Sequence, residues 1–141
     1  MTTAPAQRIA AFFESFQRRD LAQLAGWYCE DAHFRDPFND VRGIAAIRRV
    51  YDHMFDTAAD LRFQVLHVTA IPGECWMTWN FTFGARPRRT IHGASFLKLA
   101  PDGRIAVHRD YWDAAGELYE QVSVLGGLMR MIRRKLQAPQ A

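Results

Sequence analysis

The sequence predicts one α+β domain, residues 1–141, in which N-terminal helices pack on the concave face of a curved, antiparallel or mixed β-sheet. In the first third of the chain, apolar residues recur at spacings of three and four, as in helices. From Leu61 onward apolar and polar residues alternate, as they do in strands. Helices followed by long strands indicate an α+β architecture, and 141 residues with 49% hydrophobic content can bury one sizeable core.

Three helices are expected before the strands. Thr3 and Pro5 are start signals for the first, whose apolar stripe consists of Ile9, Phe12, Phe13 and Phe16. Asp20 is expected to cap a short second helix, with Gln23 at the capping-box position. A brief extended piece at 32–36 precedes the third helix, which follows Gly43. The apolar stripe of that third helix consists of Ile44, Ile47, Val50, Tyr51 and Met54.

Four strands are expected at 61–71, 75–83, 90–99 and 103–113, and an amphipathic helix at about 117–136 follows them. In the second strand, alternation places Trp79 on one face and Trp76 on the other. In the third strand it does not decide whether His92 or Ser95 faces inward, since one bulge would reverse the assignment. A curved sheet closed by helices leaves a cone between them, which is a default site for a small molecule.

Composition narrows the possible partners. The net charge is +3, and much of the excess lies in two basic runs at 86–89 and 130–135 that we interpret as solvated surface. We therefore expect neither a nucleic-acid nor a membrane partner. The chain has no apolar run of membrane-spanning length and no signal-peptide pattern, and its two cysteines lack metal-ligand spacing, which favours a cytoplasmic protein. The five histidines also lack ligand spacing, so neither a metal nor a cofactor is expected.

The strand at 103–113 is the most informative part of the chain. Side chains at alternate positions share a face, so His108, Asp110 and Trp112 lie together. A carboxylate beside an imidazole and an indole is a candidate proton-transfer site if that face lines a cavity. The alternative is that Asp110 is a satisfied structural residue, bonded to Tyr51 or to the backbone.

The order of elements and two motifs resemble the nuclear transport factor 2-like superfamily, a cone-shaped fold (a cystatin-like roll) that includes SnoaL-like polyketide cyclases, ketosteroid isomerase and limonene epoxide hydrolase. The first motif is DAHFRDPF at 31–38, followed by Gly43 and a helix reaching Tyr51. It is similar to the ketosteroid isomerase segment that carries the general base. The resemblance implies that Asp36 is a base and that Tyr51 supports an oxyanion network. Phe12 stands where that family has its oxyanion tyrosine, and the family's second aspartate falls near Ser95.

The second motif, GRI at 103–105 through RDYWD at 109–113, is similar to the last strand of limonene epoxide hydrolase. The resemblance implies that Asp110 deprotonates a water, with Trp112 as the adjoining aromatic residue. The stretch at 77–83 lacks the arginine and second aspartate of that enzyme. The chain therefore holds one acid–base element from each relative and the full set of neither.

These observations predict a cofactor-independent acid–base enzyme of isomerase, cyclase or hydrolase type, acting on a small hydrophobic molecule in the cone. The expected catalytic residues are Asp36, Asp110, Tyr51 and His108. The expected substrate contacts are Phe12, Phe38, Met54, Trp79 and Trp112. The alternative is a non-catalytic small-ligand-binding or dimerisation domain of the same fold. The resemblance also implies a homodimer formed through the outer sheet face, with Trp76, Asn80 and Thr82 as candidates.

Overall fold

The computed structural model describes residues 3–117 and 123–139. These divide into two compact units, Met1–Tyr111 and Trp112–Ala141. The helices are α1 (Thr3–Glu14), the 3₁₀ helix η1 (Arg18–Gly26), α2 (Ile44–Thr57), α3 (Ala114–Glu117) and α4 (Ser123–Leu136). The strands are β1 (Tyr28–Arg35), β2 (Asp40–Arg42), β3 (Arg62–Ile71), β4 (Glu74–Phe83), β5 (Arg89–Leu99) and β6 (Ile105–Trp112).

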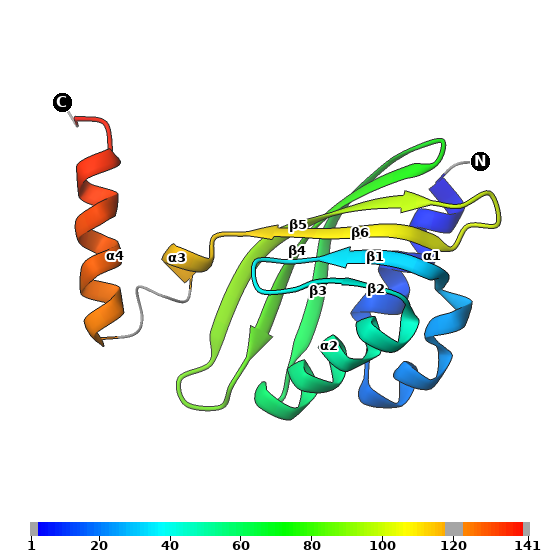
Figure 1. The fold of residues 1–141 in the computed structure, drawn as a ribbon, viewed down its shortest axis with the longest axis horizontal. Helices are drawn as coiled ribbons and strands as arrows, with labels where there is room; N and C mark the ends of the chain where they lie inside the picture. Colours follow the sequence, from blue (N-terminus) through cyan, green and yellow to red (C-terminus); the bar gives the residue numbers. More distant parts are fainter. Residues whose placement is uncertain (1–2, 118–122, 140–141) are drawn as a thin grey trace. The chain divides into compact units, whose positions relative to one another are not determined.

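The strands form one sheet in the order β2-β1-β6-β5-β4-β3. The pairs β1–β2, β3–β4 and β4–β5 are antiparallel, whereas β1 runs parallel to β6, so the sheet is mixed. Figure 1 shows the long strands curving beside α1 and α2. Rings from these helices meet rings from the sheet: Phe13 lies 5.7 Å from His108, and Phe34 lies 5.8 Å from Tyr51. The predicted α+β fold with helices on a curved mixed sheet is confirmed.

The N-terminal helices follow the predicted pattern with one correction. The stripe of α1 is buried, and Leu21 and Leu24 of η1 are buried as well. Asp20, however, does not cap the second helix. η1 begins earlier, and the Asp20 carboxylate accepts a hydrogen bond from the Gln17 backbone N–H at 2.7 Å. Asp20 therefore satisfies the backbone at the helix start from inside the first turn.

Strand β1 begins four residues before the expected extended piece at 32–36. Tyr28 pairs with Ile105 of β6, and the Ile105 N–H donates to the Trp27 carbonyl at 2.8 Å. The register shifts between Tyr28 and His33, which interrupts the alternation of faces. The simple pattern of the strand is lost there. Tyr28, Ala32 and Phe34 are nevertheless all buried.

The faces of β4 and β5 agree with the alternation. Cys75, Met77 and Trp79 are buried, whereas Trp76 on the opposite face is 45% exposed. In β5, Ser95 is buried and His92 is exposed, which answers the question that the sequence left open. The buried residues of the two strands therefore mark the inner face of the sheet.

The amphipathic helix expected at about 117–136 is represented by α4, which carries its basic residues in the last turn. The part of the prediction that falls on 118–122 lies outside the described residues. Several apolar side chains of α4 are exposed, including Val124, Leu128, Met131 and Leu136. No helix in the described parts of the chain has the length and apolar character to cross a bilayer.

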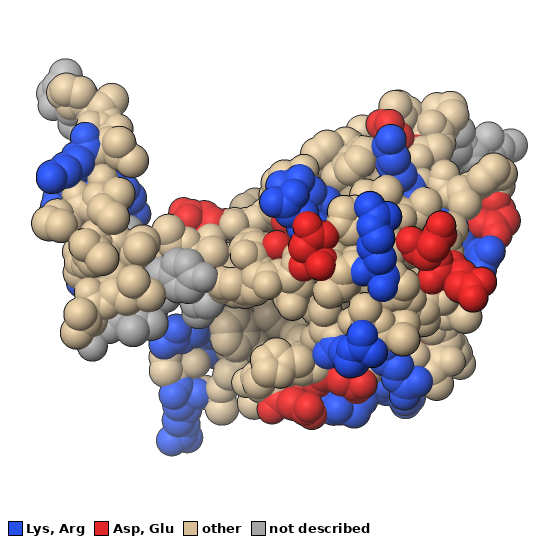
Figure 2. Space-filling model, in the orientation of Figure 1, with Lys and Arg blue, Asp and Glu red and all other residues tan. Residues whose placement is uncertain are grey.

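Acidic and basic side chains are interspersed on the face of the molecule shown in Figure 2. Several form surface ion pairs, such as Arg104 with Asp102 at 2.8 Å and Arg88 with Asp60 at 3.2 Å. Exposed pairs of this kind contribute little to stability. They do place negative charge among the basic residues, whereas a nucleic-acid-binding surface has its Lys and Arg clustered on one face. The absence of a nucleic-acid partner stays a prediction.

Candidate functional site

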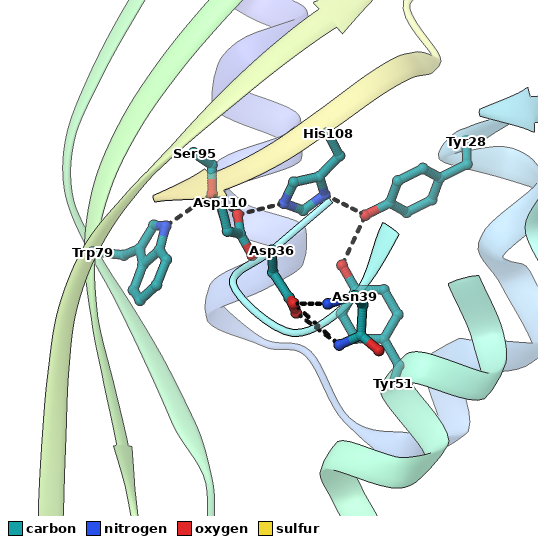
Figure 3. A network of polar contacts seen from close by, with 8 residues as sticks. All are labelled: Tyr28, Asp36, Asn39, Tyr51, Trp79, Ser95, His108 and Asp110. Carbon is teal, nitrogen blue, oxygen red and sulfur yellow. Dashed lines mark hydrogen bonds and ion pairs between the residues drawn. The ribbon is translucent and has the colours of Figure 1, made fainter. Parts of the chain in front are cut away.

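A continuous chain of hydrogen bonds runs through the interior of the first unit (Figure 3). Side chains from β1, α2, β4, β5 and β6 contribute to it, so residues far apart in the sequence meet. In order along the network, which we call the polar chain, the members are Tyr51, Tyr28, His108, Asp110, Ser95 and Trp79. Buried polar groups that are hydrogen-bonded to one another in this way specify one arrangement of a core.

Asp110 stands at the centre of the polar chain. Its Oδ1 atom accepts hydrogen bonds from Ser95 Oγ at 2.5 Å and from His108 Nε2 at 2.7 Å. No residue within 3–117 or 123–139 bonds to its Oδ2 atom, and the side chain is 20% exposed. One carboxylate oxygen is thus anchored by two donors while the other is open, which is the geometry of an oriented base.

His108 is held on both sides of its ring. Its Nδ1 lies 2.7 Å from the Tyr28 hydroxyl, and the residue is only 3% exposed. A carboxylate can only accept, so Nε2 carries a proton, and in the neutral imidazole Nδ1 then accepts from Tyr28. The sequence predicts His108 as a catalytic residue. In the structure its donor is used by Asp110, so its position favours orienting that carboxylate instead.

Tyr51 and Tyr28 form the end of the polar chain opposite Trp79, with their hydroxyl oxygens 2.8 Å apart. The alternative in which Asp110 bonds to Tyr51 is wrong, since the Tyr51 hydroxyl bonds to Tyr28. Burial raises the pKa of both phenols well above the usual value of 10.0, and the nearby Asp110 carboxylate adds to that rise. Both phenols therefore stay protonated, so they can donate hydrogen bonds but do not ionise.

Sequence reasoning missed Tyr28, because the expected strand began after it. One signal was present: Tyr28, Ala32 and Phe34 are separated by even numbers of residues, which would place them on one strand face. Extending the strand back to Tyr28 would have put a phenol on the face that bears Phe34. The sequence does not decide whether Ser95 or His92 faces inward, and the structure assigns Ser95 to the inner face.

Asp36 lies in the β1–β2 turn, where its carboxylate faces Asn39 (Figure 3). Its Oδ1 accepts from the backbone N–H groups of Phe38 at 2.8 Å and Asn39 at 2.7 Å, and the Asn39 amide reaches both of its oxygens at 3.1 Å. This is the turn-forming arrangement expected of an aspartate before Pro37. Asp36 still lies within electrostatic reach of Tyr51, whose pKa it helps to raise, as Asp110 does.

The expected substrate contacts differ in burial. Phe12 is 8% exposed and stacks on Trp27 with ring centroids 4.2 Å apart, and Trp79 is 6% exposed. Met54 is half-buried, and Phe38 in the turn is 51% exposed. Trp112 is half-buried, ends β6 and belongs to the second unit. Phe12 and Trp79 are thus packed in the core, and the role of all five as substrate contacts stays a prediction.

An open depression of about 550 Å³ lies elsewhere on the first unit. It is lined by Asp60, Arg62, Gly84, Ala85 and Arg88. No member of the polar chain lines it, so it is not the cavity that the sequence predicts. Within 3–117 and 123–139, no three His, Cys, Asp or Glu side chains are grouped as metal ligands.

Comparison with known proteins places this geometry in a family. The model of the SnoaL-like domain matches residues 9–108. No curated protein sequence matches the chain. Among solved structures, an epoxide hydrolase from M. tuberculosis that is like limonene epoxide hydrolase superimposes with a TM-score of 0.69 at 18% identity, over 94% of this chain and 98% of that one.

Two further structures share the fold. A proposed SnoaL-like polyketide cyclase from a Jannaschia species gives a TM-score of 0.71 at 16% identity, over 82% of this chain and 89% of that one. A proposed ketosteroid isomerase from Kribbella flavida gives a TM-score of 0.63 at 22% identity, over 80% of this chain and 82% of that one. The chain therefore belongs to the SnoaL-like domain family of the nuclear transport factor 2-like superfamily, whose members include isomerases, cyclases and epoxide hydrolases.

Proposed function

We propose that the protein is a cofactor-independent acid–base enzyme in which Asp110 is the general base. The observation that carries this proposal is the asymmetry of its carboxylate, with Oδ1 fixed by Ser95 and His108 and Oδ2 left open among the described residues. A base oriented in this way contributes on the order of 10²–10⁴-fold to a rate. That is sufficient for an activated carbon acid or for water attacking a strained ring.

In the proposed reaction, Asp110 Oδ2 takes a proton from an acidified carbon or from a water molecule. The hydrogen bonds of Ser95 and His108 keep the carboxylate plane fixed while its charge is neutralised. His108 in turn is held by the phenol of Tyr28. The substrate is a small hydrophobic molecule, in keeping with the apolar rings of Phe13 and Phe34 around His108.

Asp36 is the second base that the sequence suggested. Its Oδ1 already accepts two backbone hydrogen bonds in the turn, and both of its oxygens are reached by Asn39. This arrangement supports a structural role, because a proton taken up by Asp36 would weaken the turn. Asp36 is therefore a matched control for Asp110: each is a half-buried aspartate near Tyr51.

The test uses two probe compounds, an aryl epoxide and a β,γ-unsaturated ketone, and follows their hydrolysis or isomerisation. In Asp110→Asn, the amide oxygen can still accept from Ser95 and His108 while the amide NH₂ replaces the open oxygen. We expect kcat to fall by about 10²–10⁴-fold. Asp36→Asn retains a turn acceptor and is expected to change kcat by less than about tenfold. Equal rates for the wild type and Asp110→Asn would exclude Asp110 as the base.

The second candidate is a non-catalytic small-ligand-binding or dimerisation domain. The exposed aromatic cluster on the outer sheet face supports it: Trp76 is 45% exposed, Tyr111 is 44% exposed, and Phe96 lies 4.9 Å from the Trp76 ring. We propose that this face forms a homodimer whichever function holds. A probe that binds the wild type and Asp110→Asn equally and is recovered chemically unchanged would favour the binding role.

A further inference from the structure

Gly93 occupies the middle of β5, directly opposite Trp79 of β4. A Cβ atom built at Gly93 would lie 2.5 Å from Trp79 Cη2, 2.8 Å from Cζ2 and 2.9 Å from Cζ3. Glycine weakens a strand interior, so its presence there indicates that another group must approach the backbone closely. That group is the indole ring of Trp79, which lies against the backbone of Gly93.

The position of the indole fixes the direction of the hydrogen bonds that follow. Trp79 Nε1 can only donate, and it donates to Ser95 Oγ at 2.8 Å. The Asp110 carboxylate accepts, and its Oδ1 lies 2.5 Å from the same hydroxyl oxygen. The Ser95 proton must therefore point at Asp110. Because Trp79 is 6% and Ser95 3% exposed, water has little access to compete for these bonds.

We propose that Gly93, Trp79 and Ser95 form a positioning unit that sets the orientation of the Asp110 carboxylate. Ser95 acts on Asp110 directly, Trp79 acts through Ser95, and Gly93 acts by leaving room for the indole. This proposal rests on the proposed function, since it gives a base its orientation. It adds a second support for Asp110, from β4 and β5, to the one that His108 supplies from β6.

The first measurement is independent of turnover. In a ¹H–¹⁵N spectrum, Trp79→Phe identifies the indole N–H resonance of Trp79 by its disappearance. Ser95→Ala removes the acceptor of that N–H, and Gly93→Ala displaces the ring, so both are expected to shift the resonance. Ser15→Ala is the matched control, since Ser15 is an exposed serine directly after α1 that bonds only locally, and it should leave the resonance in place.

The second measurement is the effect on kcat and KM with whichever probe the wild type converts. Loss of a hydrogen bond to a charged group predicts that Ser95→Ala lowers kcat on the order of 10-fold to 100-fold and leaves KM within about twofold. Ser95→Thr keeps the hydroxyl and should recover most of the rate. Trp79→Phe leaves a smaller aromatic ring that has no N–H donor, so it should act in the same direction as Ser95→Ala but more weakly.

The outcomes separate the two proposals. An indole resonance that Ser95→Ala leaves unmoved, or an unchanged kcat in that variant, overturns the positioning unit while Asp110 can still be the base. If the resonance shifts as expected but Asp110→Asn retains full activity, the bonds are present and the proposed function fails. Should Gly93→Ala fold poorly, Ser95→Ala and Trp79→Phe still decide the result.

Discussion

Replacing Tyr28 by Phe removes the single oxygen that links Tyr51 to His108 in the polar chain, and this change is expected to be costly. The Tyr28 hydroxyl bonds to both Tyr51 at 2.8 Å and His108 Nδ1 at 2.7 Å, and the residue is 0% exposed. Its loss leaves two buried polar groups without that partner. Each such group costs about 1–3 kcal/mol, so the free energy of unfolding should fall by about 2–6 kcal/mol.

Tyr51→Phe makes the same chemical change at the end of the chain and is the matched control. Tyr28 then keeps its bond to His108, and only one hydrogen bond is lost. The expected loss is about 1 kcal/mol. The double variant should be less destabilised than the sum of the single ones by about 1–3 kcal/mol, because Tyr51 is no longer left as an orphaned hydroxyl.

Equilibrium unfolding in urea, monitored by tryptophan fluorescence and by circular dichroism, measures these differences. Coincident transitions by the two probes would justify a single free energy for each variant. The reasoning is refuted if Tyr51→Phe costs as much as Tyr28→Phe, or if the two effects are additive. Either result would mean that Tyr28 does not link Tyr51 to His108.

Two further predictions concern alkaline pH and association. Because burial raises the pKa of Tyr28 and Tyr51, the folded state keeps their protons after the unfolded chain loses them near 10.0, so their contribution to stability is complete below that pH and is lost above it. Above that pH the free energy of unfolding should fall by about 1.4 kcal/mol per pH unit for each tyrosine. When it is measured by urea unfolding from about pH 9 to about pH 11, this fall with pH should be less steep in the double Phe variant. An equally steep loss in that variant would rule the tyrosines out as its cause. For association, Trp76→Ser on the outer sheet face should weaken a homodimer at least about tenfold in sedimentation equilibrium, whereas Phe38→Ser in the β1–β2 turn should not. A wild-type chain that sediments only as a monomer would contradict the proposed dimer.

The sequence was sufficient where a local pattern encodes a face. Alternation placed Trp79 and Trp76 on opposite faces of β4, and it placed His108 and Asp110 together on β6. Helical spacing identified the buried stripe of the first helix. These predictions hold because the period of a helix or strand fixes which side chains share a side, and burial of apolar area then selects the side that faces the core.

Local patterns failed at the ends of elements. Strand β1 begins four residues before the expected extended piece, so Tyr28 was missed, and the earlier start of η1 moved Asp20 from the cap into the first turn. The partner of Tyr51 was also missed. A phenol on a buried face must find a partner, but its sequence neighbourhood gives no information on which one.

The amino-acid order by itself determined the α+β class, the succession of elements and the fact that Asp110 shares a strand face with His108. Only the tertiary structure decided that Asp110 is held by Ser95 and His108 while Asp36 closes a turn. The physical reason is that a hydrogen bond forms only within a range of donor–acceptor distances that is a few tenths of an ångström wide. Tyr28 and His108 are 80 residues apart, and the distance between their polar atoms is set by how β1 and β6 lie side by side, which no pattern within either strand encodes.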